Sequence, residues 1–406
     1  MTDRRLPIAW TGLAALSLVT LACAAPPQPA TDTAAAPVAT SPGDPGDATA
    51  FRFDATWPKP LPDNWTLGNV VGVAVDARDD IWVIHRPGSL TAEEAGAAAD
   101  PPLAECCRAA PPVIEFNQDG DVVQAWGGPG EGYEWPEAEH GIFVDHLDNV
   151  WIGGSGGNDA QILKFTQAGD FLLQIGRQGQ GQGSNDLESF GQPAEIDVDP
   201  ETNEVFIADG YGNRRVAVFD GGTGEYKRHW GAYGNTPTDD AYTYDPDAPP
   251  SQQFGRPVHC ATIARDGLVY VCDRVNDRIQ VFQKDGTYVS EHFYAPDTLS
   301  QGSTWDIDFS HDPEQKWIYL ADGQNMKVYI IERETMEVVT AFGDGGRQPG
   351  MFFAVHSIAV DSNGNIFTTE TYEGSRLQKF TFKGYAPVPA GAEGENSQGV
   401  LWPTTN

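Results

Sequence analysis

Between residues 70 and 382 the chain repeats one pattern six times, and this repetition limits the fold more than any other feature of the sequence. Each unit opens with a short β-rich segment, turns through polar residues, and continues with further segments rich in Val, Ile, Phe and Tyr. The opening segments are 72–76, 141–145, 195–199, 260–264, 305–309 and 357–361. Short segments joined by turns such as Asp266-Gly267 are typical of hairpins. A β-sandwich uses similar strands but would not repeat with this regularity, so we predict an all-β, six-bladed β-propeller.

Each unit is expected to form one four-stranded blade. The predicted blades lie near residues 70–130, 139–179, 194–234, 258–294, 303–344 and 355–382. The sixth unit lacks a clear fourth strand, and we expect residues 51–55 to supply it by pairing with 377–382, which closes the ring. The propeller then spans 51–384, and the Pro- and Gly-rich segment 385–406 is predicted to be a tail. Two insertions interrupt the repeat, at 88–111 and 235–256. Such insertions build a site or form flexible surface, and the sequence leaves both possibilities open.

The N-terminus has the pattern of an export signal. Two arginines precede an apolar run at 8–21, which is too short and wrongly flanked for a transmembrane helix. Cys23 follows Thr-Leu-Ala, which resembles a bacterial lipobox with Thr where Leu is usual, and an ordinary cleavage site also fits. We predict a signal peptide over 1–23, favour a lipid anchor at Cys23, and expect a disordered Ala/Pro/Thr tether over 24–50. The protein is therefore expected to be exported, as an envelope-anchored lipoprotein or as a periplasmic or extracellular protein.

An excess of acidic residues narrows the range of partners. The chain carries 58 Asp and Glu against 25 Lys and Arg, for a net charge of −33. Such a surface repels nucleic acid and anionic lipid, so we expect no nucleic acid as a partner and membrane contact only through the anchor. We interpret the charge as a solvated acidic surface and expect a monomer.

Export would place the cysteines in an oxidising compartment. Cys260 and Cys272 are equally far from Asp266 in sequence, so the hairpin sets them opposite each other. A cross-strand disulfide and two buried thiols both fit that position. Cys106 and Cys107 are neighbours in a polar insertion, and the sequence does not decide between a vicinal ring, two thiols and a link elsewhere.

Histidine recurs at one position of the repeat. The residues just before the opening segments are, in order, Val71, His140, Ala194, His259, Thr304 and His356. Because the innermost strands of a propeller surround its central channel, equivalent positions in alternate blades lie at one height and are related by threefold symmetry. A single His here would pack in the core, but three that converge with a fourth position open are the ligand set of a catalytic zinc.

The ends of the second strands face the same channel mouth. They carry Arg86, Tyr211 and Arg274. Each of these residues could instead form an ordinary ion pair or surface hydrogen bond, and Arg274 has Asp273 beside it as a ready partner.

On these residues the chain resembles the peptidyl-α-hydroxyglycine α-amidating lyase family, within the wider class of NHL-repeat propellers. The segments that carry the resemblance are Gly72-Val-Ala-Val-Asp76, His85-Arg86, His140-Gly141, Gln192-Pro193, Asp209-Gly-Tyr-Gly-Asn-Arg214, Pro257-Val-His259, Asp273-Arg-Val-Asn-Asp-Arg-Ile-Gln280 and His356. The resemblance covers roughly 67–382. It implies that His140, His259 and His356 bind zinc, that Tyr211 is the base, and that Arg86 and Arg274 contact the substrate.

Three positions depart from the family pattern. Ala354 stands where the family has Met, and Ser357 stands where the family has an Asp used at a structural calcium. Gly212 follows Tyr211, so the family's disulfide next to the tyrosine is missing. These changes leave the metal ligands and the base in place, but they argue against Ca²⁺ and leave the substrate open.

The resemblance implies a zinc-dependent lyase that cleaves the C–N bond of a small-molecule or peptide carbinolamide, N–CH(OH)–COO⁻, to an amide and glyoxylate. Two alternatives belong to other classes: an exported binding or scaffold propeller that keeps a structural metal, and a metal-assisted hydrolase of an ester or lactone. Tyr211 separates them, because a binding module needs no phenol near the metal and a hydrolase would more naturally use a carboxylate base.

Overall fold

The computed structural model describes residues 47–394, which contain six antiparallel four-stranded sheets and one two-stranded sheet. The first three blades are β3 (Asn69–Val75), β4 (Ile81–Arg86), β6 (Val113–Phe116) and β7 (Val122–Trp126); β8 (Glu139–Val144), β9 (Asn149–Gly154), β10 (Gln161–Thr166) and β11 (Phe171–Gly176); and β12 (Glu195–Val198), β13 (Glu204–Asp209), β14 (Arg215–Asp220) and β15 (Tyr226–Trp230). The last three are β16 (Val258–Ile263), β17 (Leu268–Asp273), β18 (Arg278–Gln283) and β19 (Tyr288–Phe293); β20 (Asp306–Phe309), β21 (Trp317–Asp322), β22 (Lys327–Glu332) and β23 (Glu337–Phe342); and β24 (Val355–Val360), β25 (Ile366–Glu370), β26 (Arg376–Pro387) and β1 (Asp47–Phe53).

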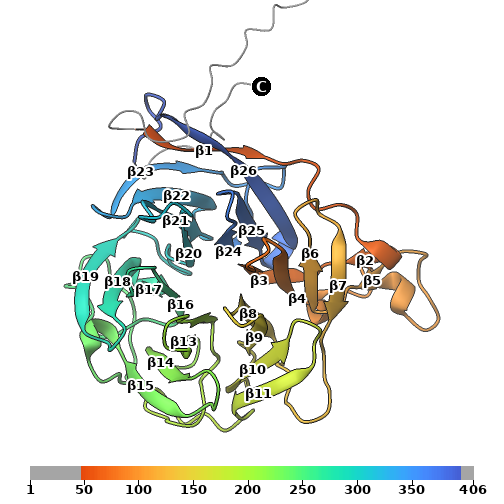
Figure 1. The fold of residues 1–406 in the computed structure, drawn as a ribbon, viewed down its shortest axis with the longest axis horizontal. Helices are drawn as coiled ribbons and strands as arrows, with labels where there is room; N and C mark the ends of the chain where they lie inside the picture. The colour runs from red at the N-terminus through yellow and green to blue at the C-terminus, as the bar shows by residue number, and fades with distance from the viewer. Residues whose placement is uncertain (1–46, 395–406) are drawn as a thin grey trace, which may run out of the picture. The chain divides into compact units, whose positions relative to one another are not determined.

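The six blades form a ring with their innermost strands toward its centre (Figure 1), where residues of these strands line a cavity, the central channel. Each innermost strand contacts the innermost strand of the next blade, and β24 meets β3 to complete the circle. Six apolar clusters fill the spaces between neighbouring blades, so the core is divided among the blade interfaces. The predicted all-β, six-bladed propeller is confirmed. Among the described residues, no helix is long and apolar enough to cross a membrane.

A buried aspartate at the end of several inner strands explains the repeated turn. Asp145 accepts hydrogen bonds from the backbone N–H groups of Leu147 and Asn149 and from the indole N–H of Trp151, at 2.9 Å each. One carboxylate therefore organises the turn and also orients a core tryptophan of the second strand. Asp76 and Trp82 repeat this arrangement in the first blade.

The last blade is closed by the N-terminal strand. Residues 51–53 pair with Phe380–Phe382 of β26, and the pairing continues outward as far as Asp47 opposite Pro387. Two boundaries therefore differ from prediction: the tether does not extend to residue 50, and the tail does not begin at 385. Ala48 and Ala50 are fully buried against the extended β26, and an Ala/Thr-rich composition gave no signal of this strand.

Short 3₁₀ turns and the two insertions complete the described chain. The turns are η1 (Pro62–Asn64), η2 (Pro87–Ser89), η3 (Gly96–Ala98), η4 (Ala232–Gly234), η5 (Arg274–Asn276) and η6 (Tyr372–Gly374). The insertion at 88–111 includes β5 (Arg108–Ala109), which pairs in parallel with β2 (Trp65–Thr66). The predicted signal peptide, Cys23, most of the tether and residues 395–406 lie outside the described residues.

All four cysteines of the propeller are in disulfides. Cys260 and Cys272 face each other across β16 and β17 and are joined, with 4.7 Å between their Cα atoms. Of the two alternatives open for this pair, the cross-strand disulfide is the one formed. Cys106 and Cys107 form a vicinal disulfide in the first insertion.

Candidate metal centre

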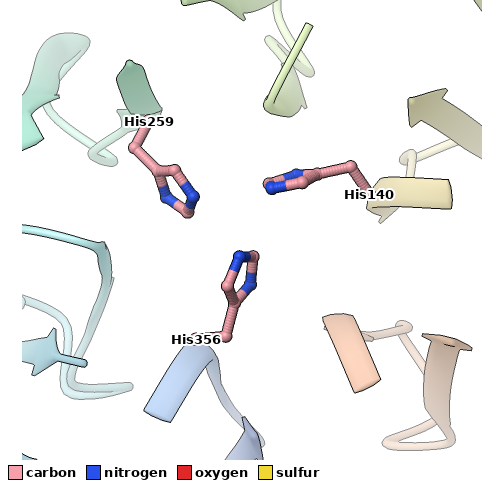
Figure 2. Close-up of side chains that lie close together, drawn as sticks. All are labelled: His140, His259 and His356. Carbon is pink, nitrogen blue, oxygen red and sulfur yellow. The ribbon is translucent and has the colours of Figure 1, made fainter. Parts of the chain in front are cut away.

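Three imidazoles converge at one end of the channel. His140, His259 and His356 lie near the starts of β8, β16 and β24, one from every second blade. Their ring centroids are 5.1, 4.8 and 4.9 Å apart, and all three side chains are buried. Figure 2 shows the rings pointing toward a common centre. The repeat brings them together because each occupies the same register position at the start of an inner strand.

Backbone carbonyls of the intervening blades orient these rings. His140 Nδ1 lies 2.8 Å from the carbonyl oxygen of Ala194, and His259 Nδ1 lies 2.5 Å from that of Trp305. A carbonyl can only accept a hydrogen bond, so Nδ1 carries the proton and Nε2 keeps its lone pair. For His356 the carbonyl of Val71 acts in the same sense, although Nδ1 makes no hydrogen bond of normal geometry within the described chain.

Burial keeps the three histidines neutral. Desolvation lowers the pKa of His140 to about 3, with Arg86 and Arg274 contributing further repulsion. The pKa values of His259 and His356 are also lowered well below normal, first by desolvation and then by nearby positive charge. Neutral imidazoles with unprotonated Nε2 atoms, gathered with their ligand atoms within 4.8 Å of one another, are the donor set of a zinc site. The three histidines therefore fit a zinc ion.

Tyr211 places its phenol against two of these rings. Its oxygen lies 3.0 Å from His140 Nε2 and 3.1 Å from His259 Nε2, and it accepts a hydrogen bond of 3.2 Å from Arg274. The glycines beside it permit this approach through space rather than through unusual dihedrals. A Cβ on Gly210 would lie 1.9 Å from the carbonyl oxygen of Val258, and one on Gly212 would lie 2.9 Å from that of Gly191.

Arg86 and Arg274 both reach the mouth of the channel without a carboxylate partner among residues 47–394. The alternative that Arg274 simply pairs with Asp273 does not hold, because Asp273 binds Arg278 at 2.8 Å. Arg274 instead donates to Tyr211 and to the side-chain oxygen of Gln301 (2.6 Å), and its guanidinium carbon lies 4.4 Å from the Trp305 ring centroid.

The donors of Arg86 go to neutral oxygens. One bond of 2.7 Å is made to the carbonyl of Glu139 and one of 2.9 Å to the hydroxyl of Ser155. Two arginines at one site without a carboxylate partner in the part of the chain that the structure describes can still bind an external anion.

Several residues of the site gave no signal in the sequence. Gln301, Ser155 and Trp305 contact the two arginines from loops or strand edges whose position depends on neighbouring blades. The structure also shows the surroundings of two of the positions that depart from the family pattern. Ala354 is buried just before β24, and the Ser357 hydroxyl accepts a hydrogen bond of 3.3 Å from the backbone N–H of Val73.

Carboxylates line the channel beyond the histidines, and these too were not predicted. The cavity encloses about 230 Å³ and is lined by the three histidines and by Glu195, Asp197, Asp306 and Asp308. Burial raises the pKa of Asp197 to about 6 and that of Asp308 to about 7. Each carboxylate accepts a backbone N–H from the next blade: Asp197 from Ile263, and Asp308 from Val360, both at 2.7 Å.

Comparison with known proteins shows similarity to NHL-repeat proteins and, more distantly, to amidating enzymes. No protein-family model matches the chain. NHL repeat-containing protein 3 of Mus musculus is 28% identical over 302 residues, which is 72% of this chain and 70% of that protein. Peptidyl-glycine alpha-amidating monooxygenase of the same species is 26% identical over 224 residues, 54% of this chain and 21% of the relative. Peptidyl-alpha-hydroxyglycine alpha-amidating lyase 1 of Drosophila melanogaster is 23% identical over 357 residues, 83% of this chain and 60% of the relative.

Proposed function

We propose that the protein is a zinc-dependent carbon–nitrogen lyase that converts an N-acyl-α-hydroxyglycine, or a similar carbinolamide, to an amide and glyoxylate. One observation carries this proposal: a phenol lies within hydrogen-bond distance of two neutral imidazoles of a three-histidine cluster and of an arginine that has no carboxylate partner in the described chain. The similarity to a protein named as an amidating lyase supports it.

The residues divide the work by their chemistry. Zinc held by His140, His259 and His356 would supply a Lewis acid that favours negative charge on a substrate oxygen. Arg86 and Arg274 would bind the substrate carboxylate through paired N–H donors. Tyr211, in its ionised form and stabilised by the hydrogen bond from Arg274, would accept the hydroxyl proton.

The bond changes then balance without any further reactant. The electrons of the O–H bond form the carbonyl of glyoxylate, the carbon–nitrogen bond breaks, and the amide nitrogen leaves with its electron pair. The phenol returns the proton to that nitrogen, which regenerates the starting state of Tyr211. No water or redox partner enters the reaction.

A second candidate is a propeller that binds a partner and keeps a structural metal, because NHL repeat-containing protein 3, which is similar over 72% of this chain, has a name that states no reaction. Both candidates would work as exported monomers, and two disulfides within the propeller support export. A binding role predicts no turnover of any carbinolamide.

One assay separates the two candidates. Purified protein, with its zinc content measured, is incubated with α-hydroxyhippurate, and benzamide and glyoxylate are quantified. We expect equal amounts of both products, loss of activity after treatment with a chelator, and recovery on adding zinc. Full zinc occupancy without any product would overturn the lyase proposal for this substrate class and favour the binding role.

A further inference from the structure

Gln301 carries an amide N–H₂ group that is not engaged, directly beside Arg274. The side-chain oxygen of Gln301 accepts a hydrogen bond of 2.6 Å from Nη2 of Arg274. A guanidinium group can only donate, so the amide oxygen must be the atom that faces it, and the orientation of the amide is determined. The amide nitrogen, Nε2, makes no hydrogen bond with any residue between 47 and 394. Because Gln301 is only half-buried, a ligand can reach its two N–H donors.

The loop between β19 and β20 fixes the backbone that carries this amide. Gly302 has a φ of +72°, and a Cβ there would lie 1.9 Å from the carbonyl oxygen of Arg274, so the loop packs directly on the backbone of the arginine. The carbonyl oxygen of Gly302 accepts a hydrogen bond of 2.7 Å from the indole N–H of Trp305. The backbone N–H of Ser303 donates one of 2.7 Å to the buried Asp277. The residue before Gly302 therefore has a defined position beside Arg274.

This position is close to the histidine cluster. The Trp305 ring that holds the loop has its centroid 5.6 Å from that of the His356 ring and 4.4 Å from the guanidinium carbon of Arg274. Arg274 donates through Nη1 to the phenol of Tyr211 and through Nη2 to the amide of Gln301. One guanidinium therefore connects the proposed base to an amide with free donors.

The proposed reaction leaves one substrate atom without a donor. Zinc and Tyr211 act on the hydroxyl, and Arg86 and Arg274 bind the carboxylate, but the acyl oxygen has no partner. When the carbon–nitrogen bond breaks, the nitrogen takes the electron pair, and amide resonance shares the negative charge with that oxygen. A positioned donor at the acyl oxygen stabilises this charge as it develops. The acyl group and the carboxylate are separated by only two atoms of the carbinolamide, so a donor beside Arg274 can reach the oxygen.

We propose that Gln301 is a further catalytic residue, whose Nε2 donates a hydrogen bond to the acyl oxygen of the substrate and stabilises the leaving amide. The inference rests on the lyase proposed above for its effect on rate, whereas the hydrogen bond itself can be measured without turnover. It also defines the substrate class more closely, because the nitrogen must carry an acyl group with an accessible carbonyl oxygen.

Binding of two unreactive carboxylates to the full-length, zinc-loaded protein tests the hydrogen bond. Hippurate has the acyl oxygen but no hydroxyl to deprotonate, and γ-phenylbutyrate has the same chain length without the amide. Gln301→Met should weaken hippurate about 3- to 10-fold, the effect of one neutral hydrogen bond, and leave γ-phenylbutyrate within about twofold. Isothermal titration calorimetry measures both. Gln283→Met, exposed at the end of β18, is the control and should leave both affinities unchanged.

Three results of the binding test would overturn the proposal. An equal loss for both carboxylates would show that Gln301 only holds Arg274 in place. Unchanged hippurate binding in Gln301→Met would show that the amide makes no contact with the ligand. Failure of the wild-type protein to bind hippurate would remove the basis for an acyl site.

The dependence of turnover on the leaving group tests the catalytic role. α-Hydroxyhippurates with a para-nitro or a para-methoxy group release benzamides that differ in how well they carry negative charge. Gln301→Met should lower kcat about 10²-fold, as expected for the loss of one such donor, and the loss should be larger for the para-methoxy compound. A loss equal for both compounds, or none, would contradict stabilisation of the leaving amide. If the wild-type protein turns over neither compound, the lyase proposal and the catalytic role fail together, and the hippurate comparison still decides the hydrogen bond.

Discussion

The two ends of the central channel are built from the same kind of strand but carry opposite chemistry. At one end, every second inner strand begins with a histidine, and Arg86 and Arg274 lie above them. Further along, β12 and β20 carry Asp197 and Asp308, which bind backbone groups four residues beyond His259 and His356. At about 3.3 Å per residue, these carboxylates lie roughly 13 Å along the strands from the histidines.

The difference shows how a repeat can separate function from structure. The two arginines of the mouth have no carboxylate partner among residues 47–394, and the three imidazoles present unprotonated Nε2 atoms to a common centre, so this end can still bind a ligand. The carboxylates deeper in the channel accept hydrogen bonds from backbone N–H groups of neighbouring inner strands, which would otherwise face the cavity unpaired. We therefore expect changes at the mouth to alter chemistry and changes deeper in the channel to alter stability.

The largest effect is expected from His259→Ala. Removing one of three imidazoles should reduce zinc content from near one ion per chain to near zero and lower lyase turnover to background. Elemental analysis and the glyoxylate assay measure both. His292→Ala, in the outer strand β19, is the matched control and should retain metal and activity. Full zinc content in His259→Ala would contradict the metal site.

Tyr211→Phe should lower turnover about 10²–10⁴-fold, because a positioned general base contributes that much to rate. The ring remains, so zinc content and melting temperature should change little. Tyr372→Phe, at the corresponding exit of the last blade and 46% exposed, should leave turnover unchanged. A Tyr211→Phe variant with full activity, or one that mainly melts earlier, would show that the phenol is structural.

Arg274 and Arg278 allow a comparison between neighbours. Arg274→Met should reduce kcat/KM about 10- to 100-fold, the value of about 1.5–3 kcal/mol for a hydrogen bond to a charged group, with little change in stability. Arg278→Met leaves Asp273 buried without its partner and should cost about 3–5 kcal/mol of unfolding free energy. Enzyme kinetics and urea unfolding measure the two effects. The prediction is wrong if the two variants exchange these behaviours.

The smallest expected effect concerns pH. The pKa of Asp308 is raised to about 7, mainly by burial, so between its unfolded value near 4 and pH 7 the folded protein holds a proton that the unfolded chain has released. The stability associated with that proton is present at low pH and is lost as the pH rises through 7. Asp308→Asn cannot titrate, so its unfolding free energy should fall less than that of the wild type between pH 5 and pH 8.

Urea unfolding at both pH values checks this prediction. Asp148→Asn, a change in an exposed turn, serves as the control and should follow the wild-type pH dependence. An Asp308→Asn profile parallel to that of the wild type would mean that Asp308 stays ionised in the folded state.

The sequence by itself determined the fold and the position of the histidines. Hairpins are local, and the repeat contains six equivalent four-stranded units, so the strand order and the register of His140, His259 and His356 follow from spacing. The sequence also placed Cys260 opposite Cys272, because both lie within one hairpin, and it left a disulfide and two buried thiols as the alternatives.

Only the tertiary structure decided which groups are free. Arg274 stands next to Asp273 in sequence, yet that carboxylate points to Arg278 across the hairpin. Residues 47–50 form a strand because they pair with β26. The carboxylates of the channel have a structural role because they bind backbone groups of the next blade. Charge pairing and burial depend on contacts between residues far apart in sequence, so the spacing of a repeat does not contain them.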